Sequence, residues 1–552
     1  MSIQKKKTAV YILLSLVVIV LAYWPHFQKG IWDGFDEVFH FYRIQGLADM
    51  LKEGVFPVKL HFTQCYGYGY GVGYFYANTF LYIPALLINL CGFSLLGAYK
   101  LFMFLVYCAI FGAGFYSAWR LTGKSEPEGA FFAATFLLFS ARLLQSVFQA
   151  MSLGQTLCFI FIPLAVAGMY LFLARDESPM MLVAGFTGVI FSHTISAFLC
   201  FCTCLFFCIW YVKKLIFNPK KLFTLIWAVG IVTGITSVFW VPMLEQLKTQ
   251  WLKVRAPWTT SEQNVEKFSG VFATYSLRYM LVLLFVICLL LLLINAVKSK
   301  KILKPHKDYG IPFFVLSIFM TWLTTAYPFW HFMNSTLGIK IIQTPHRLFT
   351  PVTILIISGM AVLYPLVNCK KVFKRIILVL VWGVGIFSYY QDYSDHFLKT
   401  DYNEINEVIA GTVAGLGAGE EWLPIETDRE EMTEPLIATD NEGNKVLGEK
   451  TNNNTVYRFT ADLSKEYYDI PYIWYRGFKA SDEQGNVYEI GQSRKTGMVI
   501  VHMPEGGEGS TLITITHGKT KWEKLSYLST LGGVVMLGGY LWFEKRGKGY
   551  VS

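Results

Sequence analysis

The chain has 552 residues, of which 54% are hydrophobic and 16% are charged, with a net charge of +10. This composition is too apolar for a soluble protein with long polar loops, and it indicates a multispanning membrane protein. The net charge is divided unequally. Residues 391–526 carry 24 acidic and 13 basic side chains, a net of −11, which leaves +21 for the remainder. We read this asymmetry as a signal of membrane topology rather than of nucleic-acid binding.

The first apolar run, 9–24, follows Lys5, Lys6 and Lys7 and has no small-residue cleavage site after it. It therefore predicts an uncleaved span with its N-terminus in the cytoplasm. Counting the later apolar runs gives about 12 spans and places both termini in the cytoplasm. The predicted later spans are 99–119, 129–140, 155–174, 180–192, 195–212, 222–243, 275–294, 311–327, 348–367, 376–390 and 527–543. With this count, every strong basic cluster falls on the cytoplasmic side.

The apolar run 79–96 is long enough to span, but counting it inverts every later loop. We interpret it as a re-entrant or interfacial segment on the outer face. The sequence then divides into a helical membrane body (1–390) with a long first outer loop (26–78), an outer domain (391–526), and a last span with a basic tail (527–552). Nine of the ten cysteines lie in apolar or cytoplasmic segments, and the outer domain has none, so disulfides do not hold it together.

The second half of the outer domain alternates short β-branched and aromatic runs with Gly, Asp, Asn and Pro turns. Runs at 456–460, 472–475, 486–490, 498–502 and 512–516 predict strands of a small sandwich or jelly-roll. The aromatic run Tyr472-Ile-Trp474-Tyr475 has two interpretations, sugar binding and core packing. Core packing is the interpretation we favour.

The polar residues of the first outer loop are the main candidates for catalytic groups. Asp33, Asp36, His40 and Arg43 are spaced by three, four and three, which is one stripe on a helix. We expect that helix to end near Glu53, before Gly54. A carboxylate beside a cationic group at a membrane surface is suited to acid–base chemistry on a lipid-linked substrate. The alternative is a helix cap with surface ion pairs.

Further along the loop, Gly and Tyr alternate from Gly67 to Tyr70. Such a backbone approaches a ligand closely, and Tyr68 and Tyr70 offer faces on which a sugar stacks. The alternative is an interfacial aromatic belt. It is not a phosphate loop, because no Gly-Lys-Ser/Thr follows.

Several strings resemble a known group of proteins. They are Asp36-x-x-x-His40-x-x-Arg43, Gly54-x-x-Pro57, Gly67-Tyr-Gly-Tyr70, Leu81-Tyr82-x-Pro84, Phe239-Trp240-x-Pro242, Gln343-x-Pro345-x-Arg347 and Trp474-Tyr475-x-Gly477. This order resembles bacterial membrane proteins named "6-pyruvoyl-tetrahydropterin synthase-related" and, more distantly, is similar to GT-C glycosyltransferases, including YfhO-like proteins. The pterin name implies clustered zinc-binding histidines, whereas the ten histidines here are scattered, so we do not carry that chemistry over.

The GT-C resemblance implies a GT-C-like membrane body, a polyprenyl-phosphate-sugar donor, an outer-face active site and a catalytic Asp in the first outer loop. Asp36 is the matching position, and Asp33 is the second candidate. Glu37 points to another face of the helix and ranks third. The sequence departs from the family pattern at Gln149–Gln155, where relatives carry Arg and Glu, and at His346, where an aromatic residue is common.

Arginine suits the leaving phosphate because its guanidinium donates two parallel hydrogen bonds. We favour Arg347, which follows Gln343-Thr-Pro345; Gln343 is also predicted to bind substrate. The alternative for Arg347 is an interfacial arginine that binds a lipid headgroup. Arg43 is expected either to bind the phosphate or to pair with Asp36, and Arg142 is the weaker candidate. The remaining predicted substrate-binding residues are Glu37, His40, Tyr68, Tyr70, Gln155, His193 and Glu245. Each of His193 and Glu245 has a structural alternative, a helix-end histidine and an interfacial cap.

These residues lead to one expectation with two rivals. We expect an inverting glycosyltransferase of the bacterial plasma membrane that modifies a cell-envelope polymer or glycolipid on the outer face. A transporter or flippase for lipid-linked glycans would place charges at mid-bilayer on several helices, and the predicted spans are almost free of charge. A non-enzymatic assembly protein would tolerate Asp36→Asn. No cofactor is required in this reading, although Asp33, Asp36 and Glu37 could bind Mg²⁺ or Mn²⁺.

Overall fold

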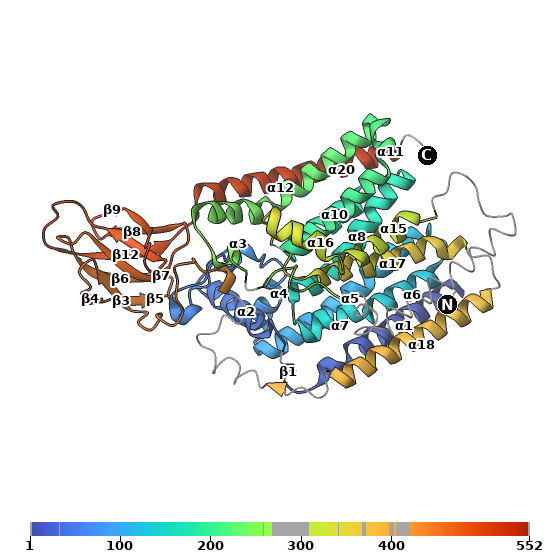
Figure 1. Ribbon diagram of the computed structural model, residues 1–552, viewed down its shortest axis with the longest axis horizontal. Coiled ribbons are helices and arrows are strands. Elements are labelled where there is room, and N and C mark those ends of the chain that lie inside the picture. The colour runs from blue at the N-terminus through green and yellow to red at the C-terminus, as the bar shows by residue number, and fades with distance from the viewer. Residues whose placement is uncertain are drawn as a thin grey trace. The chain divides into compact units, whose positions relative to one another are not determined.

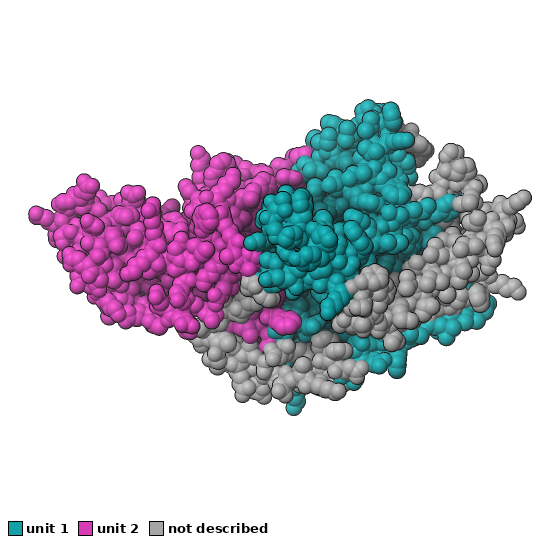
Figure 2. All heavy atoms as spheres, viewed as in Figure 1, with its two compact units in different colours: residues 1–34, 100–232, 258–403 teal, residues 35–99, 233–257, 404–552 magenta. Residues whose placement is uncertain are grey.

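The computed structural model describes residues 3–32, 34–257, 259–267, 309–340, 342–366, 371–396, 402–403 and 420–549. The chain forms two compact units (Figure 2). Unit 1 comprises Met1–Gly34, Lys100–Val232 and Trp258–Asn403. Unit 2 comprises Phe35–Tyr99, Thr233–Pro257 and Glu404–Ser552. Each unit therefore combines segments that are distant in the sequence.

Unit 1 consists mainly of apolar helices (Figure 1). They are α1 (Ile3–Tyr23), α5 (Leu95–Leu121), α6 (Pro127–Leu138), α7 (Ala141–Leu144), α8 (Leu153–Arg175), α9 (Met180–Ile190), α10 (Thr194–Trp210), α11 (Val212–Ile216), α12 (Pro219–Thr249), α15 (Ile311–Leu323), α16 (Tyr327–His331), α17 (Phe349–Leu363) and α18 (Lys371–His396). The first turn of α5 and the second half of α12 belong to unit 2. A two-stranded ribbon pairs β1 (Ile31–Trp32) with β2 (Tyr402–Asn403).

Within the described residues, eight helices are long and apolar enough to cross a membrane, or nine if the bent pair Ile311–Leu323 and Tyr327–Thr336 is one span. Two further predicted spans are the short helices α9 and α10. The predicted span 275–294 lies outside the described residues. The predicted re-entrant run contains α4 (Tyr82–Cys91), whose ten residues are too few to cross a bilayer.

Glycines allow α8 and α9 of unit 1 to approach each other closely. A Cβ on Gly185 of α9 would lie 2.2 Å from the backbone nitrogen of Ala165 on α8. A Cβ on Gly168 of α8 would lie 2.3 Å from the nitrogen of Leu182. These two helices therefore touch backbone to backbone, as small residues permit in membrane helices.

In unit 2, α12 and α20 (Lys521–Gly549) pack in the same way (Figure 1). A Cβ on Gly533 would lie 2.5 Å from the nitrogen of Ile235. Polar groups fix the contact one turn away. The Ser237 hydroxyl donates to the Ser526 carbonyl at 2.9 Å, and the Val238 N–H donates to the Thr530 hydroxyl at 3.2 Å.

The rest of unit 2 consists of α2 (Glu37–Lys52), α3 (Val72–Phe75), α4 and a β-sandwich. One five-stranded antiparallel sheet has the order β10-β11-β7-β3-β4, and the other has the order β5-β6-β12-β8-β9. The strands are β3 (Ile437–Asp440), β4 (Lys445–Leu447), β5 (Glu449–Thr451), β6 (Val456–Asp462), β7 (Tyr467–Ile473), β8 (Phe478–Asp482), β9 (Val487–Tyr488), β10 (Ile490–Gln492), β11 (Met498–His502) and β12 (Ser510–His517). The predicted β-rich domain is confirmed: the predicted runs overlap β6, β7, β9, β10, β11 and β12, whereas β8 and the earlier strands β3, β4 and β5 were not predicted.

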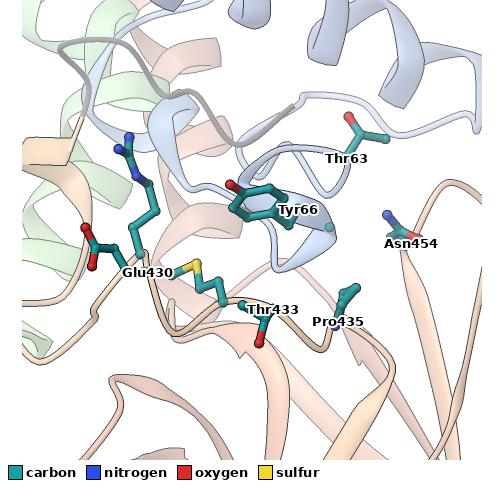
Figure 3. Close-up of a pocket in the computed structure, with 9 residues that line it drawn as sticks. Thr63, Tyr66, Glu430, Thr433, Pro435 and Asn454 are labelled. Carbon is teal, nitrogen blue, oxygen red and sulfur yellow. The ribbon is translucent and has the colours of Figure 1, made fainter. Parts of the chain in front are cut away.

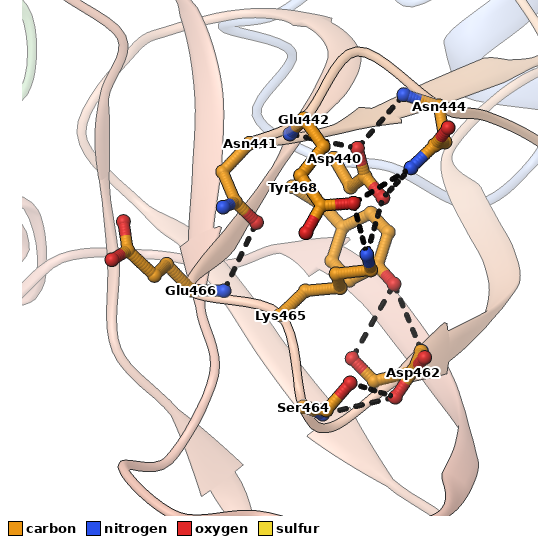
Figure 4. Close-up of polar contacts among 9 residues, drawn as sticks. All are labelled: Asp440, Asn441, Glu442, Asn444, Asp462, Ser464, Lys465, Glu466 and Tyr468. Carbon is orange, nitrogen blue, oxygen red and sulfur yellow. Dashed lines mark hydrogen bonds and ion pairs between the residues drawn. The ribbon is translucent and has the colours of Figure 1, made fainter.

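Two hairpin turns of the sandwich are stabilised by the same pattern of hydrogen bonds to an aspartate carboxylate. Asp440 precedes the β3–β4 turn, and its carboxylate accepts hydrogen bonds from the backbone N–H groups of Glu442 and Asn444 and from the Asn444 side chain (Figure 4). Asp482 does the same for Gln484 and Asn486 at the β8–β9 turn. These bonds lower the pKa of Asp482, with the Asn486 side chain contributing most. The acidic side chains here therefore stabilise turns.

The first outer loop packs against the sandwich within unit 2. The Ile473 N–H donates to the Tyr68 carbonyl at 2.9 Å, and the Lys450 ammonium donates to the carbonyls of Gly67 (2.6 Å) and Pro471 (2.7 Å). The Phe62 ring contacts the Tyr472 ring edge-on at 5.6 Å. Tyr472 and Tyr475 are fully buried, so these two rings pack in the core as favoured, whereas Trp474 between them is only partly buried.

Candidate functional site

Asp36 occupies the N-cap position of α2, and Glu37 is the first helical residue. The carboxylate of Glu37 lies where the helix dipole favours negative charge, and its side chain is buried. The Asp36 side chain is half-buried and makes no capping hydrogen bond. The alternative that Asp36 serves as a helix cap therefore finds no support in the geometry. Asp33 lies outside the described residues. The helix ends at Lys52, and Gly54 adopts a positive φ of 72°, as predicted.

Arg43 lies one turn beyond His40 on the same buried face of α2. Its guanidinium donates to the carbonyls of Tyr76 (3.4 Å) and Ala77 (3.3 Å) and to the side-chain oxygen of Asn78 (3.1 Å). It also lies over the Tyr76 ring at 5.1 Å, and burial lowers its pKa to about 10. Its donors are thus directed at oxygens of the protein, and whether Arg43 binds a phosphate or pairs with Asp36 stays a prediction.

The hydrogen-bond network around Arg43 extends to Asn78, His61 and Gln64, which the sequence analysis did not single out. Asn78 donates to the Val58 carbonyl at 3.1 Å and lies 3.3 Å from Nε2 of His61. Nδ1 of His61 lies 3.3 Å from Gln64, whose amide donates to the Tyr42 carbonyl at 2.7 Å. Burial, assisted by the charge of Arg43, lowers the pKa of His61 to about 3, so its ring is neutral at physiological pH. No spacing rule in the sequence links these positions, because they lie on separate turns of an irregular loop.

The tyrosines of the Gly-Tyr stretch differ in exposure. Tyr68 is 7% exposed, and Tyr70 is fully buried with its backbone paired to His61. Tyr66, by contrast, is 40% exposed. The sugar-stacking role predicted for Tyr68 and Tyr70 therefore has less accessible surface available to it than Tyr66 offers.

A second polar cluster lies in unit 1, formed by α7, the first turn of α8 and the first turn of α17. The Arg142 guanidinium donates to Gln155 (2.9 Å), to the Thr350 hydroxyl (3.1 Å) and to Gln145 (3.4 Å). Two predicted residues, Arg142 and Gln155, are thus in direct contact. Three neutral oxygens fix the plane of the guanidinium, which is the preorganisation that an oxyanion site requires.

Arg347 and its neighbours lie on the segment leading into α17. Arg347 donates to Gln343 at 3.0 Å, which joins another predicted pair. Nε2 of His346 contacts a carboxylate oxygen of Glu266, and His346 lies within electrostatic range of Arg142. The sequence marked His346 only as a departure from the family pattern, and Glu266 was not singled out at all.

His193 and Glu245 hold structural positions. His193 is the N-cap of α10 and is buried, and its Nδ1 accepts a hydrogen bond from the Ser196 N–H at 3.2 Å. Glu245, in unit 2, accepts a hydrogen bond from the Thr520 hydroxyl at 2.6 Å and lies 3.5 Å from Nε of Arg476. The position of His193 matches the helix-end alternative stated for it, whereas these contacts do not test the interfacial cap stated for Glu245. Their roles towards a substrate stay predictions.

Within the described part of the chain, no group of three or more His, Cys, Asp or Glu side chains is placed to hold a metal ion. The proposed divalent-cation site would need Asp33, which is outside that part. Metal dependence therefore stays a prediction.

The clusters and the fold together define the class of protein. The chain is a multispanning α-helical membrane protein with a C-terminal β-sandwich domain. No family model matches it. An uncharacterized protein of Lactococcus lactis subsp. cremoris (strain MG1363) is 24% identical over 258 residues, which are 44% of this chain and 41% of that protein.

Among solved structures, the chain is similar to the cryo-EM structure of the arabinofuranosyltransferase AftD from mycobacteria, with 11% identity and a TM-score of 0.44. The likeness covers 94% of this chain and 40% of that one. In both comparisons the match spans less than half of the other protein. A likeness at this identity and TM-score does not establish a shared activity.

Proposed function

We propose that this protein is a membrane glycosyltransferase. It moves a sugar from a polyprenyl-phosphate donor to a cell-envelope polymer or glycolipid on the outer face of the bacterial plasma membrane. The observation that carries the proposal is the position of Asp36. Asp36 is partly buried at the start of α2, and Arg43 of the same helix donates to Asn78, which lies beside His61. A base needs both access to its substrate and a fixed position.

In the proposed step, Asp36 takes the proton from the acceptor hydroxyl. The acceptor oxygen attacks the anomeric carbon of the donor sugar, and the bond between that carbon and the phosphate oxygen breaks. The electron pair leaves with the polyprenyl phosphate, and the configuration at the anomeric carbon inverts. An arginine is proposed to bind the leaving phosphate: Arg347 is favoured, Arg43 is the alternative in the same unit as Asp36, and Arg142 is the weaker candidate.

The proposal is tested by replacing Asp36 with asparagine, which preserves shape and removes the base. Envelope glycans from cells with matched membrane levels of each variant are compared. We expect Asp36→Asn to lower product at least 100-fold, within the range of general-base catalysis. The matched control is Asp49→Asn on the same helix, whose carboxylate accepts a hydrogen bond from Gln45 at 2.8 Å. The control should retain most of the product.

A second variant tests the phosphate role. Arg142→Lys keeps the charge and loses the planar fork, so we expect product to fall at least tenfold. Arg175→Lys, in the last turn of α8, is its control. Undiminished product from Asp36→Asn would remove Asp36 from the mechanism and favour an assembly protein. Accumulation of a completed lipid-linked glycan on the cytoplasmic side would favour a flippase.

A further inference from the structure

A pocket of about 550 Å³ opens within unit 2 between the first outer loop and the sandwich (Figure 3). Pockets of 300–1,000 Å³ are the usual size for small-ligand sites. Thr63, Tyr66 and Gly67 line it from the loop. Its other lining residues come from the segment before β3 and from the β5–β6 turn, and they are Arg429, Glu430, Met432, Thr433, Pro435 and Asn454.

Hydrogen bonds fix the wall of the pocket that the loop forms. Lys450 donates to the carbonyl of Gly67, and the Asn454 amide donates to the Phe62 carbonyl at 3.4 Å. The Glu434 N–H donates to the Tyr68 hydroxyl at 3.2 Å. These contacts tie the loop to the sandwich on both sides of Tyr66, so the pocket walls belong to one rigid body.

The backbone conformation at Tyr66 explains why its ring lines the pocket. Cys65 and Tyr66 are consecutive non-glycine residues with positive φ, at 51° and 53°. This conformation costs free energy for residues with a Cβ, and such outliers gather at functional positions. Its effect here is to leave the Tyr66 ring on the pocket wall, whereas Tyr68 and Tyr70 turn inward. Figure 3 shows the Tyr66 side chain among the lining residues.

The chemistry of the lining selects the ligand class. Tyr66 supplies an aromatic face, and Thr63, Thr433 and Asn454 supply hydroxyl and amide groups. One cation, Arg429, and one anion, Glu430, line the pocket, and Arg429 also pairs with Glu420 at 3.1 Å. The pocket therefore has no excess of positive charge for a phosphate or a polyanion. An aromatic platform with surrounding hydroxyl and amide groups suits the apolar face and the hydroxyls of a neutral sugar.

We propose that this pocket binds a neutral segment of a glycan, with Tyr66 as the stacking residue. That the glycan is the acceptor of the transfer reaction rests on the proposed function. The proposal that the pocket binds a glycan is independent of the proposed function.

The test is saturation-transfer NMR with full-length protein in detergent. The probes are chitotriose, cellotriose and maltotriose, with inorganic phosphate as the anionic probe. We expect at least one trisaccharide to bind and phosphate not to compete with it. Tyr66→Gly should weaken binding roughly tenfold, the scale of an aromatic contact. Glycine tolerates positive φ, so this variant should melt no lower than the wild type. Tyr66→Phe should retain most of the binding.

The control is Val487→Ala on β9, which removes an 82% exposed side chain of the same sandwich and should leave binding unchanged. Asp36→Asn should also bind normally, which separates this proposal from the proposed reaction. Equal binding by Tyr66→Gly, failure of all three trisaccharides to bind the wild type, or displacement of the bound sugar by phosphate would each overturn the proposal.

Discussion

At the scale of single residues, Lys450 is a partly buried charge in unit 2. Its ammonium is enclosed by the carbonyls of Gly67 and Pro471 and lies 4.2 Å from the centre of the Tyr472 ring. Burial lowers its pKa from 10.5 to about 7. A group that ties two segments together therefore titrates in the physiological range.

This shift predicts how stability depends on pH. Between pH 7 and 10.5 the unfolded chain binds more protons at Lys450 than the folded chain does, so the free energy of unfolding rises with pH in that window. Burial also lowers the pKa of Lys59 to about 8, which has the same sign. We expect the thermal midpoint of the detergent-solubilised protein to rise between pH 6.5 and 9.5, and Lys450→Met to reduce that rise. Lys445→Met, at an exposed lysine of the same domain, should not. An unchanged slope in Lys450→Met would refute the assignment.

Individual site residues were predictable in type and not in environment. The spacing placed His40 and Arg43 correctly on one buried face of α2, whereas Asp36 precedes the helix at its N-cap position and Asp33 lies outside the described residues. It did not reveal that Arg43 is buried against the carbonyls of Tyr76 and Ala77, because those partners lie in an irregular segment. Likewise, the contact between Arg142 and Gln155 joins two helices across a turn and leaves no periodic signal.

At the scale of elements, the contact between α12 and α20 makes a sharp prediction. Gly533 has no room for a Cβ, whereas its neighbour Gly532 has nothing within 4 Å. Gly533→Ala should force the helices apart and cost about 1–3 kcal/mol of stability, as overpacking does. Gly532→Ala should be neutral or stabilise slightly, because alanine is the better helix former. Thermal denaturation of both variants in detergent measures the difference, and equal midpoints would contradict the contact.

Helices were predicted correctly where the apolar run in the sequence was long. The spans predicted at 155–174 and 222–243 correspond to α8 and α12, which are longer by a few residues at their ends. Strands β3, β4 and β5 were missed because they are three or four residues long and lie in an acidic segment. The last helix begins at Lys521 rather than at residue 527, because its first turn is polar and carries no hydropathy signal.

At the scale of the whole molecule, the distribution of charge predicts which side of the membrane each segment faces. Residues 391–526 are acidic, and the basic clusters lie between spans. We expect a membrane-impermeant thiol reagent added to intact cells to label Val487→Cys in the sandwich and not Lys213→Cys in α11. Cys91, the exposed cysteine among those described, is replaced by serine in the background. Labelling at position 213 from outside would overturn the predicted topology.

The interlocking of the first outer loop with the sandwich has a consequence for how the protein is made. Phe62 and Tyr74 are translated about 400 residues before Tyr472 and Tyr475, the rings that they contact in the folded protein. Until then, those aromatic surfaces lack their native cover. The sandwich expressed alone would likewise leave its Tyr472 and Phe478 faces without the loop. A recombinant fragment of the C-terminal domain should therefore be prone to aggregate, and supplying the loop on the same polypeptide should restore its solubility.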